Sequence, residues 1–225
     1  MNPVSGAGLL FDIDGTLIDS DALHLKAFNI LLEPYGHHFD KVRFTAELQG
    51  FSNLSIGQRF LNGEPAERQA EILRGKEALF RDLATGALEP VHGLMALLDA
   101  ADVAGLPMIA VTNAPRLNAE MMLGAVGITR RFKGLIIGEE LTHGKPHPLP
   151  YLEGLRQLGA DPRYCVAFED SRTGIASAVA AGLDTIGMMS SLSTDQVIDA
   201  GAILASADFA DPALLAFIDR KVSGR

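Results

Sequence analysis

The sequence predicts an α/β protein with a Rossmann-like parallel sheet as its core and an all-helical domain inserted into it. From about residue 88 onward, short apolar runs alternate with segments of helical periodicity, which is typical of crossover units on a parallel sheet. A further apolar run, LLFDI, lies at residues 9–13, and residues 19–87 after it contain no convincing strand. We therefore expect an α/β core formed by residues 1–18 and 88–225, and a helical domain over residues 19–87.

The core elements are predicted in a regular order. After LLFDI, the predicted strands are LPMIAV, GLIIG, YCVAF and DTIGM. The predicted helices between and beside them are HGLMALLDAADVAG, RLNAEMMLGAVG, PLPYLEGLRQLG and RTGIASAVAAG. This alternation places helices on both faces of the sheet.

The inserted stretch reads as helices that each end at a glycine, which is an expected helix stop. These segments are DALHLKAFNILLEPYG, DKVRFTAELQG, LSIGQRFLNG and PAERQAEILRGKEALFRDLATG. The two connections to the core, near residues 17–20 and 86–90, would act as hinges.

Composition excludes several classes of protein. The net charge is −9 and no run of lysine or arginine is longer than two, so we expect no nucleic-acid partner. No apolar stretch is long enough for a bilayer span, and the single Cys165 rules out an internal disulfide framework. The first residues carry no signal sequence, so we expect a cytoplasmic protein, and we expect a monomer. Order is not predicted for residues 1–6 and for the tail DRKVSGR.

The run LLFDIDGT carries two carboxylates, Asp12 and Asp14, followed by Gly15. Residues two apart on a strand point the same way, so the two carboxylates could converge on one target. Held that close, they repel each other unless a cation or a shared proton intervenes. A hairpin turn at DG is the alternative, but the following residues recur at helical spacing and give no return strand.

Other reactive side chains also follow predicted strands. These are Thr112 and Asn113 after LPMIAV, Glu169, Asp170 and Ser171 after YCVAF, and Lys145 in the loop after GLIIG. In an open parallel sheet the ligand crevice lies beyond the carboxyl ends of the strands, so these groups would converge on one site. Each also has an ordinary explanation. The pair Thr112 and Asn113 and the pair Asp170 and Ser171 could each cap the helix that follows, and Lys145 could be a solvated turn residue.

Taken together, these residues can bind a metal ion and a phosphate. Asp12, Glu169 and Asp170 offer hard oxygen ligands, and Mg²⁺ favours a few carboxylates together with water and a substrate phosphate. Thr112 and Lys145 offer a hydroxyl donor and a cation for phosphoryl oxygens. Carboxylates, a metal, a hydroxyl and a lysine around one phosphate indicate phosphoryl transfer.

The residues also resemble the haloacid dehalogenase superfamily of phosphohydrolases. Its four motifs occur in order as DIDGT (12–16), VTN (111–113), GKPHP (144–148) and FEDS (168–171), and the inserted helices resemble its helical cap. The resemblance implies that Asp12 is the nucleophile, which forms an aspartyl-phosphate, and that Asp14 is the general acid and base. It also implies that Mg²⁺ is held by the Asp12 side chain, the Asp14 carbonyl and Asp170, with Glu169 assisting. Thr112 and Lys145 would hold the phosphoryl group, with substrate contacts from Gly15, Thr16 and Asn113.

The inserted helices resemble those of β-phosphoglucomutases and sugar-phosphate phosphatases. His24, the segment QGFSN with Ser52 and Asn53, and Lys76 have counterparts there, which implies substrate contacts in the cap. Each also has an ordinary interpretation: a packed hinge residue for His24, N-capping for Ser52 and Asn53, and a solvated helix residue for Lys76. The mutases place an arginine where this chain has Asn53, and asparagine cannot supply a bidentate cation for a second phosphate.

We therefore expect a Mg²⁺-dependent phosphatase that acts on small phosphorylated sugars or polyols. A β-phosphoglucomutase-type phosphomutase is the first alternative. A non-catalytic phosphate-binding module is the second, and the complete set of Asp12, Asp14, Lys145 and Asp170 argues against it.

Overall fold

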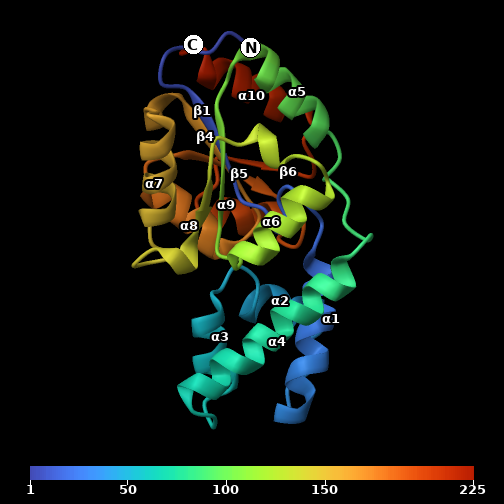
Figure 1. Cartoon of the computed structure of the whole chain (residues 1–225). Helices are drawn as coiled ribbons and strands as arrows, with labels where there is room; N and C mark the ends of the chain where they lie inside the picture. The colour runs from blue at the N-terminus through green and yellow to red at the C-terminus, as the bar shows by residue number, and fades with distance from the viewer.

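A single sheet of six parallel strands forms the centre of the molecule in a computed structural model that describes all 225 residues (Figure 1). The strand order is β3-β2-β1-β4-β5-β6. The strands are β1 (Gly8–Phe11), β2 (Met108–Thr112), β3 (Leu135–Ile137), β4 (Cys165–Glu169), β5 (Asp184–Met188) and β6 (Leu204–Ser206). Because β1 pairs with both β2 and β4, the carboxyl ends of these three strands are neighbours at one edge of the sheet.

Helices cover both faces of the sheet. Because alternate residues of β1 point in opposite directions, this strand contacts helices on both faces. Leu9 and Phe11 pack with α5 (Leu94–Ala104), α6 (Arg116–Ala125) and α10 (Pro212–Val222). Leu10 packs on the other face with α7 (Leu149–Leu158) and α8 (Arg172–Ala180). The short helix α9 (Thr194–Asp199) packs against α8 through Val197 and Ile175. The predicted α/β fold class with a parallel sheet is confirmed.

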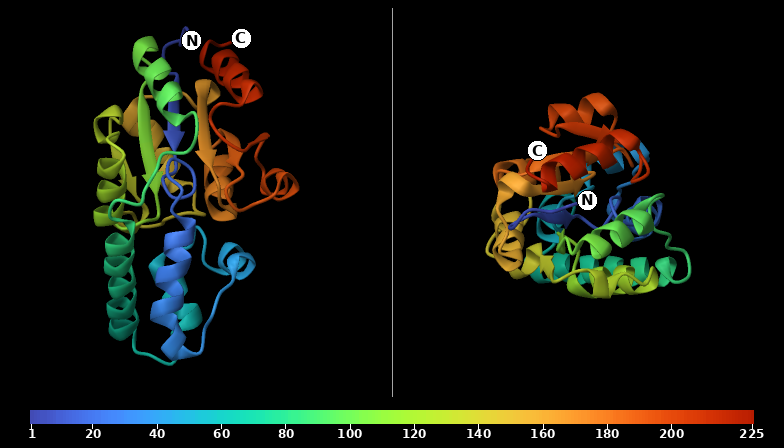
Figure 2. Two further views of the ribbon diagram at one scale, coloured as in Figure 1. Left: turned by 90° about the vertical axis from the view of Figure 1, so that its right-hand side faces the viewer. Right: turned by 90° about the horizontal axis from the view of Figure 1, so that it is seen from above.

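Residues 19–87 contain helices and no strand, as predicted. The helices are α1 (Asp21–Leu32), α2 (Lys41–Glu47), α3 (Asn53–Phe60) and α4 (Ala66–Ala84), and we call these four the cap. The cap has an apolar cluster of its own, which includes Phe28, Phe39, Phe44, Phe60 and Leu73. Figures 1 and 2 show the cap at the end of the molecule opposite the two chain termini. That residues 19–87 form a separate domain stays a prediction.

The C-terminal part of the chain differs from the expectation. The edge strand β6 and the helices α9 and α10 were not among the predicted elements. The tail DRKVSGR was not expected to be ordered, and this was wrong: most of it belongs to α10, and Val222 is 0% exposed. Val222 completes the apolar face that Leu214 and Ile218 begin, and its carbonyl accepts a hydrogen bond from the amide of Val4. No helix of the chain has both the length and the apolar character that crossing a bilayer requires.

Candidate active site

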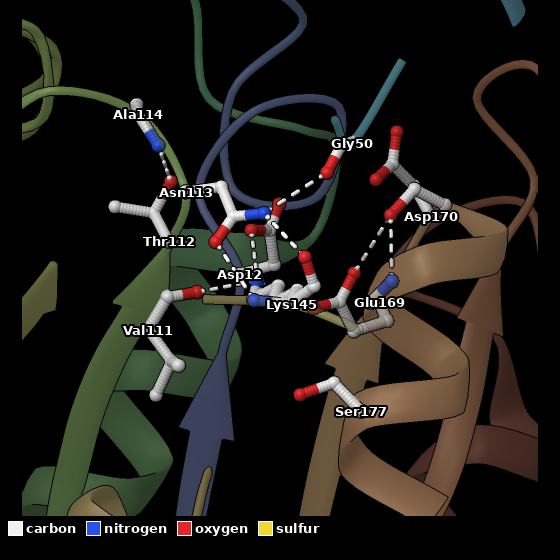
Figure 3. A network of polar contacts seen from close by, with 12 residues as sticks. Asp12, Gly50, Val111, Thr112, Asn113, Ala114, Lys145, Glu169, Asp170 and Ser177 are labelled. Carbon is white, nitrogen blue, oxygen red and sulfur yellow. Dashed lines mark hydrogen bonds and ion pairs between the residues drawn. The ribbon is translucent and has the colours of Figure 1, made fainter. Parts of the chain in front are cut away.

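The polar residues that follow the central strands meet at the carboxyl edge of the sheet (Figure 3). Asp12 follows β1 directly, Thr112 ends β2, and Glu169 ends β4. Carboxylate oxygens of Asp12, Glu169 and Asp170 all lie within 4.8 Å of one another, and all three residues are buried. Parallel pairing of adjacent strands thus brings together residues that are more than 150 positions apart in the sequence.

Lys145 is the cation at the centre of this group. Its Nζ lies 2.5 Å from Asp12 Oδ1 and 2.6 Å from Glu169 Oε1, and it donates to the carbonyl of Val111 at 2.7 Å. The residue is 6% exposed, so the interpretation as a solvated turn lysine is wrong. Burial alone would lower the pKa of Lys145, but Asp12 and Glu169 outweigh it and raise that pKa above its usual value. The side chain is therefore an ammonium ion in a site with excess negative charge.

The carboxylates around Lys145 are electrostatically unsatisfied. Burial raises the pKa of Asp12 well above its ordinary value, and the charges of Glu169 and Asp14 add to this. Burial also raises the pKa of Asp170, together with the charges of Asp21 and Asp12. One ammonium ion does not neutralise three close carboxylates. Their oxygen atoms are the hard donors that Mg²⁺ prefers, so Asp12, Asp170 and Glu169 fit a divalent cation.

Glu169 also helps to position Lys145. Its Oε1 accepts a hydrogen bond from Tyr151 Oη at 2.5 Å in addition to its ion pair with Lys145. Tyr151 belongs to α7 and is fully buried. Glu169 therefore holds the Lys145 ammonium beside Asp12, whether or not it also binds a metal.

Asp14 lies in a separate chain of hydrogen bonds that leads into the cap. Its Oδ1 accepts from Ser20 Oγ at 2.7 Å and from His24 Nε2 at 2.8 Å. The other ring nitrogen of His24, Nδ1, lies 3.0 Å from Lys76 Nζ. An ammonium can only donate, so Nδ1 accepts and the ring proton is on Nε2, where it points to Asp14. Burial would raise the pKa of Asp14, but His24 and Ser20 lower it below its usual value.

Lys76 and His24 are built into the cap rather than solvated. Lys76 is 2% exposed and its Nζ lies 4.2 Å from the centre of the Phe28 ring. The His24 ring stacks on Phe80 with centroids 3.7 Å apart. The alternative that Lys76 is a solvated helix residue is therefore wrong, while His24 is both packed and next to the site.

The turn after Asp12 is shaped by Gly15 and Thr16. Gly15 has φ +71°, and a Cβ there would lie 2.0 Å from Asp170 Oδ2, so only glycine fits. The Thr16 hydroxyl is fully buried and has no hydrogen-bond partner in the protein. Neither residue lines the cleft between the cap and the sheet, so their substrate contacts stay a prediction.

Asn113 joins three segments that surround the site. Its Nδ2 donates to the carbonyls of Gly50 and Lys145 at 3.0 and 3.1 Å, and its Oδ1 accepts from the Lys145 amide at 3.0 Å. The side-chain amide is therefore occupied in holding the Lys145 loop against the cap. Thr112 Oγ1 accepts from the Ala114 amide at 2.9 Å, which leaves its hydroxyl proton free to donate into the cleft.

The structure gives helix-capping roles to two residues for which that alternative was open. Ser171 caps α8 by accepting from the Gly174 amide at 3.1 Å. Ser52 caps α3 by accepting from the Ser55 amide at 3.3 Å, and it does not line the cleft. Asn53 does line the cleft, and its Nδ2 donates to Glu77 Oε1 at 2.9 Å.

Several residues that line or support the cleft were not among the predicted site residues. Gln49 reaches across from the cap, and its Nε2 donates to Asp170 Oδ2 at 2.6 Å and to Asp21 Oδ2 at 3.1 Å. Glu77 and Tyr151 were also missed. In the sequence, Asp21 and Glu77 cannot be distinguished from ordinary helix carboxylates. Gln49 is the first residue of the segment QGFSN, and that segment is the only local signal the sequence gives for these residues.

Comparison with known proteins gives the family of the chain. A family profile described as haloacid dehalogenase-like hydrolase matches residues 9–188, which include all four motifs around the site. The chain belongs to the haloacid dehalogenase-like hydrolases. Membership agrees with the resemblance seen in the sequence and with the parallel sheet.

Relatives of this hydrolase include named phosphatases. It is 31% identical to the fructose-1-phosphate phosphatase YqaB of Escherichia coli (strain K12), over 80% of this chain and 95% of that protein. It is 32% identical to a phosphoglycolate phosphatase of Xylella fastidiosa (strain 9a5c), over 79% of this chain and 78% of that protein. The crystal structure of CbbY from Rhodobacter sphaeroides in complex with phosphate superposes with a TM-score of 0.81. That structure is 29% identical and covers 94% of this chain and 98% of its own.

Proposed function

We propose that this hydrolase is a Mg²⁺-dependent phosphatase that cleaves small phosphorylated sugars or polyols through an aspartyl-phosphate on Asp12. The observation that carries the proposal is the position of Asp12, which lies at the end of β1 beside a buried ammonium and two further carboxylates. The hydrolase family and the relatives named as phosphatases support a phosphoric monoester hydrolase. The chain is therefore placed among enzymes that work on phosphate esters.

In the first proposed step, an Asp12 carboxylate oxygen attacks phosphorus, the ester P–O bond breaks, and Asp14 gives a proton to the leaving alkoxide. In the second step, Asp14 takes a proton from water, the water oxygen attacks phosphorus, and Asp12 is released with inorganic phosphate. Lys145 and Thr112 hold the phosphoryl oxygens. The net reaction consumes one water molecule and returns both aspartates to their starting state.

The hydrogen bonds of Asp14 support its proposed role as the base of the second step. The hydrogen bonds from His24 and Ser20 favour its carboxylate form, which is the form that accepts a proton from water. To act as the acid in the first step, Asp14 must carry a proton, and the loss of these two hydrogen bonds favours that form. Ser20 and His24 therefore set the protonation state of Asp14.

Asp12, Asp170 and Glu169 are the residues that would hold the metal, with the Asp14 carbonyl as the expected fourth donor. When bound, Mg²⁺ supplies positive charge that favours ionised Asp12 and offsets the charge of the phosphoryl oxygens. This is the charge that one lysine alone does not provide to the site.

We favour hydrolysis over mutase activity because the cleft has no arginine to grip a second phosphate. No arginine lines it, and the Asn53 amide is already donated to Glu77. A phosphomutase has to bind a bisphosphate, which calls for a cation at the far end of the cleft. The phosphomutase therefore remains the second candidate.

The test is the release of phosphate from p-nitrophenyl phosphate and from a panel of sugar monophosphates, with Mg²⁺ and with EDTA. We expect turnover only with Mg²⁺, and a loss on the order of a thousandfold or more in Asp12→Asn, whose side chain has nearly the same shape. Turnover that persists in EDTA or in Asp12→Asn contradicts the proposal. Conversion of β-glucose 1-phosphate with a bisphosphate primer into glucose 6-phosphate, faster than hydrolysis, would indicate the mutase.

A further inference from the structure

The cleft as a whole is lined by more carboxylates than cations. Among the residues that line the cleft, the carboxylates are Asp12, Asp14, Asp21, Glu77 and Asp170. The cations are Lys76 and Lys145 alone. Lys145 and its carboxylate partners lie at the phosphoryl end, so Lys76 is the one cation that the cap offers to the rest of a substrate.

Lys76 is not available to an anionic substrate group, because protein acceptors use all of its hydrogens. Its Nζ donates to Glu77 Oε1 at 3.0 Å, to Glu77 Oε2 at 3.1 Å and to His24 Nδ1 at 3.0 Å. An ammonium has three N–H groups, and three acceptor atoms occupy them. The Glu77 carboxylate therefore neutralises the only lysine or arginine of the cap that lines the cleft.

Glu77 is fixed in this position from both sides. Asn53 Nδ2 donates to its Oε1 at 2.9 Å, and Asn118 Nδ2 donates to its Oε2 at 2.6 Å. Arg81 holds Asn118 in turn, through a hydrogen bond of 2.7 Å to Asn118 Oδ1. Burial would raise the pKa of Glu77, but Lys76 and His24 lower it, so the carboxylate is ionised near neutral pH. Since Asn118 belongs to α6, this network also joins the cap to the sheet-bearing part of the chain.

A second carboxylate lies on the other side of Asn53. Glu139, which is exposed, comes within 3.4 Å of Asn53 Nδ2 through its Oε1. A negatively charged group that entered next to Asn53 would thus meet Glu77 and Glu139. Like charges at such a short range are unfavourable, and partial burial strengthens the repulsion.

We infer that Glu77, assisted by Glu139, makes this enzyme select phosphate esters whose leaving group is neutral and reject those whose leaving group carries a second anion. The preferred substrates are then monophosphates of sugars and polyols, and the rejected ones are phosphorylated acids and bisphosphates. This inference rests on the proposed phosphatase function. It assigns to Glu77 a role in specificity rather than in catalysis.

The test compares phosphoglycolate with its carboxamide, because the two have nearly the same shape and differ in the charge of the leaving group. We expect the wild-type enzyme to show a kcat/KM for the carboxamide at least tenfold higher than for phosphoglycolate. In Glu77→Gln this ratio should fall at least fivefold, mainly through a lower KM for phosphoglycolate, because Lys76 is no longer neutralised. A merely structural role of Glu77 would change both substrates alike.

Two further variants keep the test decisive. Glu139→Gln changes an exposed residue and should lower the ratio in the same direction, so it carries the test if Glu77→Gln does not fold. Glu71→Gln is the matched control, since Glu71 is an exposed carboxylate on the same helix α4, and it should leave the ratio unchanged.

The outcomes separate the inference from the proposed function. A wild-type enzyme that hydrolyses phosphoglycolate as well as its carboxamide overturns the inference, as does an unchanged ratio in both glutamine variants. A wild-type enzyme that hydrolyses neither compound nor p-nitrophenyl phosphate overturns the proposed phosphatase function itself.

Discussion

Replacing Lys145 by methionine removes the only cation between Asp12 and Glu169 while keeping a side chain of similar length. The Lys145 ammonium lies 2.5 Å from Asp12 and 2.6 Å from Glu169, and all three side chains are buried. Methionine cannot donate a hydrogen bond, so two buried carboxylates would face each other without compensation. Breaking a buried ion pair by removing one partner costs about 3–5 kcal/mol of unfolding free energy.

This cost should be visible in both chemical and thermal unfolding. For a chain of this size, 1 kcal/mol corresponds to about 2–4 °C, so Lys145→Met should lower Tm by roughly 6–20 °C. The assay is urea denaturation together with a thermal scan, both in EDTA so that no divalent cation replaces the lysine. Lys133→Met is the matched control, because Lys133 is exposed and forms no ion pair, and its unfolding free energy should change by less than about 0.5 kcal/mol.

The pH dependence of the deficit gives a second test. Burial raises the pKa of Asp12 above its unfolded value, and Lys145 opposes that rise, so without Lys145 the pKa of Asp12 in the folded state rises further. When folding raises the pKa of a carboxyl group, the folded protein binds more protons than the unfolded chain between the two pKa values. The free energy of unfolding therefore falls as pH rises from the unfolded pKa through the folded pKa. The deficit of Lys145→Met should therefore be larger near pH 8 than near pH 5.5. A deficit under about 1 kcal/mol near pH 8, or one that grows as the pH falls, would refute the assignment of Lys145 as the compensating charge.

Three further predictions concern the cleft and the core. In Gly50→Ala the new Cβ would lie 2.3 Å from Thr173 Oγ1, at a residue whose φ is +77°. The cap should then no longer close on the sheet edge, and kcat/KM should fall about tenfold or more. An unchanged kcat/KM would argue against this contact. His24→Ala removes a hydrogen bond that lowers the pKa of Asp14, so the acidic limb of the pH–rate profile should move to higher pH; a shift to lower pH would contradict the assignment. Burial raises the pKa of Cys165 to about 12, so iodoacetamide should label it only after denaturation, and rapid labelling of the folded enzyme would show that the thiol is accessible.

Much of the fold could be predicted because the central strands are buried on both faces. Such strands appear in the sequence as continuous apolar runs, as in LLFDI and YCVAF, and the predicted strands match β1 to β5. Strand β6 has only three residues at the edge of the sheet, and two of them are half-buried, so it gives no comparable signal. The tail was misjudged because Val222 is one apolar residue among polar ones, and its burial depends on where α10 packs.

The centre of the site could also be predicted, because the topology of a parallel sheet brings the ends of adjacent strands together. Asp12, Thr112 and Glu169 follow directly from that rule. The cap contacts could not be predicted in the same way. Whether Lys76 is solvated or buried, and whether Glu77 faces it, depends on how α4 lies against α1 and α6, which no local pattern in the sequence encodes. The family resemblance drew attention to Lys76 but gave no indication of Glu77.

The most direct measurement is the detection of phosphate covalently bound to Asp12 during turnover. The enzyme would be mixed with a ³²P-labelled sugar monophosphate and Mg²⁺, quenched in acid within milliseconds, and digested for peptide mapping. We expect an acid-stable, hydroxylamine-sensitive label on the peptide that contains residues 9–18, and no label in Asp12→Asn. Phosphate release without any such label, or a label on a different residue, would contradict the account of Asp12 as the nucleophile.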